Sequence, residues 1–110
     1  MSQIYQQNNT TYNFKNIEEF ITHDKFNIIV FSTKFVNLPA NPLNFYKVSI
    51  FNSSPDPYIL RTRSSNDLIY SSLYAPKGTK DIKILSKQFI EIFYIFDSVT
   101  RQGHWNLQIY

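Results

Sequence analysis

Phe89-Ile90-Glu91-Ile92-Phe93-Tyr94-Ile95-Phe96 is the stretch that decides the fold class of this chain. It combines aromatic rings with β-branched isoleucines, and such side chains pack well on the pleated surface of a sheet. Because the run is apolar at odd and even positions alike, the pattern predicts a strand at residues 88–96 in the middle of a sheet. The rings of this run are expected to belong to the core.

The whole chain shares this composition. Ten Phe, eight Tyr and one Trp make up 17% of its 110 residues, whereas there are only two glycines. A chain of this length forms one domain and buries roughly two-thirds of the surface that its unfolded form exposes. The rings exceed the needs of one small core, so we expect several of them to be exposed at a partner or ligand site.

Period-two alternation recurs from residue 26 onward, interrupted by loops rich in Pro, Asn and Ser. The predicted strands cover residues 26–36, 45–51, 58–63, 67–74, 80–85, 88–96 and 104–110, with a tight turn at residues 75–78. About seven short strands with turn signals between them predict a mainly β fold, an antiparallel β-sandwich of the jelly-roll or Greek-key type.

One short helix is expected before these strands, at residues 16–23. Four apolar residues recur at helical spacing, namely Phe14, Ile17, Phe20 and Ile21. Asn16 is a suitable N-cap for such a helix. The polar residues 1–13 are predicted to form a flexible arm or an edge strand, and residues 14–110 a single β-sandwich domain.

Charge and residue usage exclude several classes of site. The net charge of +3 is well short of the strongly basic footprint of a dedicated nucleic-acid-binding domain. Without cysteine, disulfides, zinc-thiolate centres and thiol nucleophiles are excluded. Two glycines leave no phosphate-cradling glycine loop. We expect no cofactor and no metal.

Groups suited to catalysis are scarce. The two histidines, His23 and His104, have no metal-type spacing, and a general base at neutral pH would have to be one of them or a pair of carboxylates. We therefore expect that the protein is not an enzyme. Three loop aspartates, Asp56, Asp67 and Asp97, leave calcium binding open, although calcium needs about six to eight oxygen ligands.

Arg61 and Arg63 lie two residues apart on a predicted strand, so both guanidinium groups leave the same face. Planar guanidinium forks suit phosphate or carboxylate. Tyr58 lies nearby, on the opposite face of the strand. The ordinary alternative is a solvated sheet face with ion pairs to Asp67 or Glu91.

A second basic group follows in the sequence. Lys77, Lys83 and Lys87 are separated by even numbers of residues and are expected to share a face, together with Tyr74. Such a patch suits nucleic acid or an anionic membrane, but lysines on an exposed strand also prevent edge-to-edge aggregation. The candidate ligand-binding residues are therefore Tyr58, Arg61, Arg63, Tyr74, Lys77, Lys83 and Lys87.

Two expectations concern the remaining rings. Trp105 alternates with Leu107 and Ile109 and is expected in the core. The rings expected at the surface are Phe45 or Tyr46, Tyr70 or Tyr74, and Tyr110.

These features predict a non-catalytic, structural module that binds a protein partner or assembles with itself into a homo-oligomer. Binding of nucleic acid or an anionic surface through a basic aromatic patch is one alternative, and glycan binding through exposed Tyr or Trp is another. No signal peptide and no transmembrane segment is visible in the sequence. A cytoplasmic or particle-associated location is therefore expected.

Overall fold

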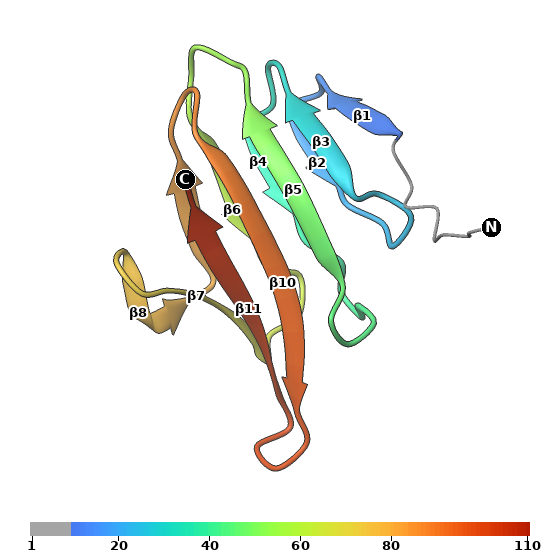
Figure 1. The fold of residues 1–110 in the computed structure, drawn as a ribbon, viewed down its shortest axis with the longest axis vertical. Coiled ribbons are helices and arrows are strands. Elements are labelled where there is room, and N and C mark those ends of the chain that lie inside the picture. The colour runs from blue at the N-terminus through green and yellow to red at the C-terminus, as the bar shows by residue number, and fades with distance from the viewer. Residues whose placement is uncertain (1–9) are drawn as a thin grey trace, which may run out of the picture.

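Two β-sheets lie face to face in the computed structural model, which describes residues 10–110 (Figure 1). The larger sheet contains, in spatial order, β1 (Thr11–Phe14), β3 (Asn27–Val30), β5 (Lys47–Asn52), β10 (Phe89–Asp97), β11 (Gln102–Ile109), β7 (Asp67–Ser71) and β8 (Ala75–Thr79). The smaller sheet contains β2 (Glu18–Phe20), β4 (Phe35–Asn37), β6 (Tyr58–Arg61) and β9 (Asp81–Ile84). The fold is mainly β and resembles a sandwich.

Both sheets are mixed rather than antiparallel. From β1 to β6 the chain alternates between the sheets, so that β1, β3 and β5 run parallel in one, and β2, β4 and β6 run parallel in the other. Antiparallel pairs join β10 to β5 and β11, β7 to β8, and β6 to β9. The predicted antiparallel sandwich of jelly-roll or Greek-key type is therefore corrected to a mixed β-sandwich.

The helix predicted at residues 16–23 is absent, and β2 occupies this segment instead. Phe14 and Ile21 are buried, at 2% exposure each, whereas Ile17 is 69% exposed and Phe20 is 44% exposed. The helical spacing arises because a turn separates two short strands, so the four side chains do not share one face. Pairing of β2 with β4 satisfies the backbone here without a helix.

Other predicted elements have different outcomes. Residues 1–9 of the predicted arm lie outside the described residues, while residues 11–13 belong to β1, an edge strand. The strand predicted at residues 26–36 divides into β3 and β4, and the turn predicted at residues 75–78 is strand β8. The strand predicted at residues 88–96 is confirmed as β10, the middle strand of the larger sheet.

The hydrophobic core lies between the sheets and receives alternate residues of each strand. Ile90, Ile92 and Tyr94 of β10 point inward and are buried. Trp105 of β11 is fully buried, with its ring centre 5.0 Å from that of Tyr94 and 6.3 Å from that of Tyr46. The expectation that Trp105 belongs to the core is confirmed. Among the described residues there is no helix long and apolar enough to cross a bilayer.

Candidate functional site

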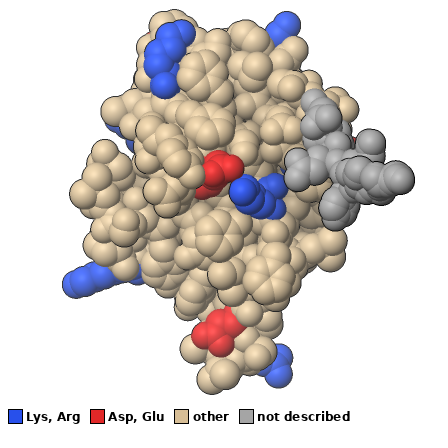
Figure 2. Space-filling view, in the orientation of Figure 1, with Lys and Arg blue, Asp and Glu red and all other residues tan. Residues whose placement is uncertain are grey.

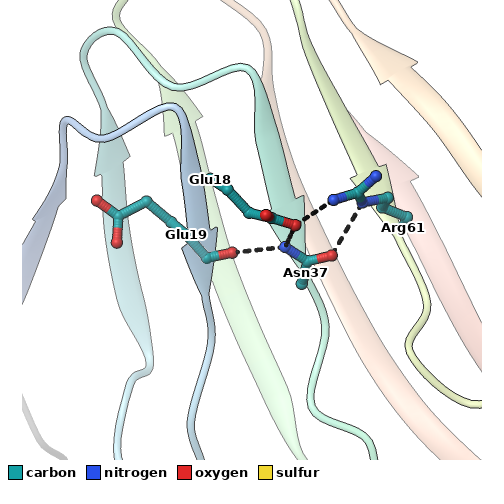
Figure 3. Close-up of polar contacts among 4 residues, drawn as sticks. All are labelled: Glu18, Glu19, Asn37 and Arg61. Carbon is teal, nitrogen blue, oxygen red and sulfur yellow. Dashed lines mark hydrogen bonds and ion pairs between the residues drawn. The ribbon is translucent and has the colours of Figure 1, made fainter.

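The predicted arginine site lies on the outer face of the smaller sheet. Arg61 at the end of β6 donates from Nε to Asn37 Oδ1 at 2.9 Å and forms an ion pair with Glu18 (Figure 3). Its guanidinium carbon is 4.1 Å from the centre of the Phe35 ring, within cation–π range. The ion-pair partner is therefore Glu18 of β2, and not Asp67 or Glu91 as the sequence suggested.

Asn37 is the centre of this network and is only 4% exposed. Its Nδ2 group donates to Glu18 Oε2 at 3.2 Å and to the Glu19 carbonyl oxygen at 3.0 Å (Figure 3). One side chain on β4 thus links β2 to β6. The edge of the Arg61 guanidinium group is bound by Asn37 and Glu18, and its planar face lies over the Phe35 ring. These contacts favour a structural role for this arginine.

The other two candidates near β6, Arg63 and Tyr58, lie on opposite faces of the smaller sheet. Arg63 is exposed, and its guanidinium carbon lies 5.0 Å from the centre of the Phe20 ring. Arg61 and Arg63 therefore stack on rings of the same outer face, as their spacing predicted. Tyr58 points into the core at 1% exposure, where burial raises its pKa well above the ordinary value. A buried Tyr58 has no surface to offer a ligand, so its inclusion among the binding residues is corrected.

The lysines of the predicted patch are distributed over two sheets and a turn. Lys77 lies on β8 at the edge of the larger sheet, whereas Lys83 lies on β9 at the edge of the smaller sheet. Lys87 lies in the turn after β9 and donates from Nζ to the Ser53 carbonyl oxygen at 2.7 Å. Tyr74 is 60% exposed in the turn before β8. Lysines on edge strands match the ordinary alternative, protection of sheet edges.

Histidines and aspartates form no metal-ligand cluster in residues 10–110. His104 of β11 packs against Tyr70 with ring centres 4.9 Å apart, while His23 lies in the turn between β2 and β3, beside Tyr46. Asp97 accepts backbone hydrogen bonds from the turn that follows β10, at 2.9 Å from Val99 N. His23 and His104 thus have ring contacts, and Asp97 has a backbone partner.

An open pocket of about 470 Å³ lies between the loops that follow β4 and β6 and the hairpin that joins β10 to β11. Asp67, 4% exposed, forms part of its wall and accepts a long hydrogen bond of 3.5 Å from the Tyr94 hydroxyl. Burial raises the pKa of Asp67, and burial together with the nearby carboxylate raises the pKa of Tyr94. Arg101, with a left-handed φ of 60°, lies on another wall.

A group of exposed and half-exposed rings lies on the outer face of the larger sheet. We define the aromatic face as the outward residues Ile29, Phe51, Phe89, Phe93, Ile95 and Tyr110, with Lys47 and Glu91 between them. Figure 2 shows this face as mostly uncharged, with charged side chains near its centre and at its margins.

The strand register assembles an apolar row at one end of the aromatic face. Ile29 lies beside Phe51, and Phe51 lies beside Phe89. The ring centre of Phe89 is 5.6 Å from that of Tyr110, which extends the row past β11. Exposure is 38% for Phe89 and 66% for Tyr110. Three strands and Tyr110, the residue directly after β11, therefore contribute to one continuous apolar strip.

A polar group occupies the middle of the aromatic face. Glu91 Oε2 lies 3.4 Å from Lys47 Nζ, and Glu91 Oε1 accepts a 2.7 Å hydrogen bond from the Tyr110 hydroxyl. This donation, followed by the charge of Lys47, holds the pKa of Glu91 below its ordinary value. Phe93 pairs with Lys47 across the strands and is 37% exposed, as is Ile95. The two charges neutralise each other among the rings.

The sequence predicted the surface rings in part. Phe45 is 71% exposed, Tyr74 and Tyr110 are exposed as well, and Tyr46 is buried. The rings of the 89–96 run were assigned to the core, and this assignment is wrong for Phe89, Phe93 and Phe96, which are exposed, whereas Tyr94 is buried. The signal that pointed to them was the apolar character of the run at both odd and even positions.

Comparison with known proteins identifies a fold likeness and no family. No family model and no curated protein matches the chain. A solved structure described as "Structure of a chaperone-substrate complex" contains a chain of similar fold, with a TM-score of 0.53 and 18% sequence identity. The alignment covers 88% of this chain and 16% of that chain, so this chain spans a small part of the other's length. At this identity the likeness concerns the fold alone.

Proposed function

We propose that this chain is a non-catalytic protein-interaction module that binds its partner through the aromatic face. One observation carries the proposal. The middle strand, β10, has large apolar side chains at Phe89, Phe93 and Ile95 on its outward face, where each is 37–38% exposed. Antiparallel strands with one face in water ordinarily place polar residues on that face.

The energetics favour covering these rings. An aromatic side chain presents roughly 150–250 Å², so hiding the exposed part of Phe93 removes roughly 70 Å² from water. At about 25 cal/mol per Å² this is worth roughly 2 kcal/mol before the costs of association. Several such rings on one face supply the apolar centre that protein interfaces require.

The chemistry of the face selects among kinds of partner. Glu91 and Lys47 neutralise each other, so the face has no net charge with which to attract a phosphate backbone or an anionic membrane. The expected partner surface is apolar and weakly charged, as protein surfaces at interface centres are. The solved structure of similar fold belongs to a chaperone–substrate complex, and a protein-binding role for this chain accords with that description.

Site-specific photo-cross-linking tests the proposal. A benzoylphenylalanine at Phe93 is expected to form protein adducts in cells that express the chain, and mass spectrometry identifies them. The matched control places the same group at Phe20, an exposed ring on the outer face of the opposite sheet. No adducts at Phe93, or equal labelling at Phe20, would overturn the proposal.

A further inference from the structure

We infer that the partner of the aromatic face is a second copy of this chain, packed face to face about a twofold axis. The inference rests on the proposed function, because it names the occupant of the same surface. Its first support is charge. Lys47 and Glu91 lie side by side near the middle of the face, on neighbouring strands β5 and β10.

In a twofold interface, residue i of one copy contacts residue j of the other, and j contacts i. An axis that lies in the plane between two faces and passes midway between Lys47 and Glu91 exchanges the positions of these two groups. Glu91 of each copy then lies opposite Lys47 of the other. A unit with one positive and one negative centre is complementary to itself, whereas a face with two like charges would repel its own copy.

The ring nearest this axis is Phe93. It pairs with Lys47 across the strands and lies two residues after Glu91 on β10, so it borders both charged groups. The same rotation therefore brings Phe93 of one copy next to Phe93 of the other. Aromatic pairs of this kind add to the affinity beyond the area that they bury. A single twofold axis therefore accounts for both the pair of rings and the ion pairs beside it.

The area of the face fits a modest dimer. It spans four strands from β3 to β11, roughly 19 Å by 23 Å at the usual strand spacing and rise, or about 440 Å² in projection. Two such faces bury roughly 900 Å², below the roughly 1,200 Å² of standard interfaces and in the range of weak, transient ones. We therefore expect dissociation in the micromolar range rather than an obligate dimer.

Charge reversal provides the test, with the association constant measured by sedimentation equilibrium. The wild-type chain is expected to dimerise, and Lys47→Glu or Glu91→Lys alone is expected to weaken dimerisation at least tenfold. An equimolar mixture of the two variants is expected to recover heterodimers, because one copy is then negative and the other positive at the axis. Rescue by mixing separates an intermolecular contact from damage to the fold.

A control and the contrary outcomes complete the design. Lys83→Glu changes the charge on the outer face of the opposite sheet and is expected to leave dimerisation unchanged. A monomeric wild-type chain at millimolar concentration, or a mixture that associates no better than either variant alone, would overturn the inference. If Phe93 still cross-links to a different protein in that case, the proposed function stands and only the second copy is excluded.

Discussion

Some positions in the core have no space for a larger side chain, and Gly103 is a clear example. A β-carbon there would overlap Asp67 Oδ1 and the Tyr94 hydroxyl, and it would lie 2.5 Å from Tyr94 Cε1. Overpacking of this kind typically costs about 1–3 kcal/mol. Gly103→Ala is therefore expected to lower the free energy of unfolding by about that amount in urea denaturation. Gln102→Ala is the control, since its side chain leaves the opposite face, and equal effects of the two changes would contradict the expectation.

The burial of Asp67 makes the stability of the fold depend on pH. Burial raises the pKa of its carboxyl in the folded state, so the folded protein binds this proton more tightly than the unfolded chain does. The stability that Asp67 contributes is then fully present below its ordinary pKa of about 3.9 and is lost as pH rises through the folded-state pKa. At neutral pH the buried charge is a cost.

Asp67→Asn is therefore expected to be more stable than the wild-type chain at pH 7. The amide oxygen still accepts a hydrogen bond from the Tyr94 hydroxyl, while the charge is gone. The advantage should shrink as pH falls and vanish well below about 3.9, where the wild-type carboxyl is protonated in both states. Urea denaturation across this range measures it. A variant that is less stable at every pH would show that the carboxylate itself stabilises the fold.

At the scale of elements, three strands of the smaller sheet depend on one amide. Asn37→Ala removes the groups that pair with Arg61 Nε and with the Glu19 carbonyl oxygen, and it leaves both without that partner. Leaving a buried polar group unpaired costs about 1–3 kcal/mol, and the free energy of unfolding is expected to fall accordingly. Arg63→Ala removes only an exposed stacking contact and should cost less than about 1 kcal/mol. Similar losses in both variants would contradict the central role of Asn37.

Elements also differ in how far the sequence could predict them. β10 and β11 are long. The aromatic and β-branched residues of the 89–96 run identified β10, and the alternation of residues 104–110 identified β11 and the burial of Trp105. β2 has three residues, Glu18–Phe20, too few for alternation to outweigh the helical spacing around it. Its partner is β4, and the sequence pattern had merged β4 with β3 into a single predicted strand at residues 26–36.

The same limit applies to the sites. The Asn37 network depends on the parallel register of Phe20, Asn37 and Arg61, which are far apart in sequence. No local pattern encodes such a register. The aromatic face is different, because the apolar character of the 89–96 run on both sides was visible in the sequence. What the sequence did not contain was that only one side of β10 is covered by the second sheet.

At the scale of the whole molecule, both sheets share one hydrophobic core. The two halves of the chain nevertheless differ in how their strands are connected. The first half coils between the sheets in parallel strands, and the second half adds the long hairpin of β10 and β11. A shared core favours a single cooperative unfolding transition. Within the folded state, protection should still decline from the centre of the larger sheet toward its edges.

Native-state hydrogen exchange tests this gradient. Backbone amides of β5, β10 and β11 are expected to exchange slowest, because each of these strands lies between two neighbours and its inward side chains are buried. Amides of β1 and β8, the two edges of the larger sheet, are expected to exchange through local opening at lower free energy. Two-dimensional NMR after transfer to heavy water measures both groups. If the amides of β1 through β4 exchange as slowly as those of β10, the parallel strands are as stable as the centre of the larger sheet. The predicted decline in protection from β10 outward is then wrong.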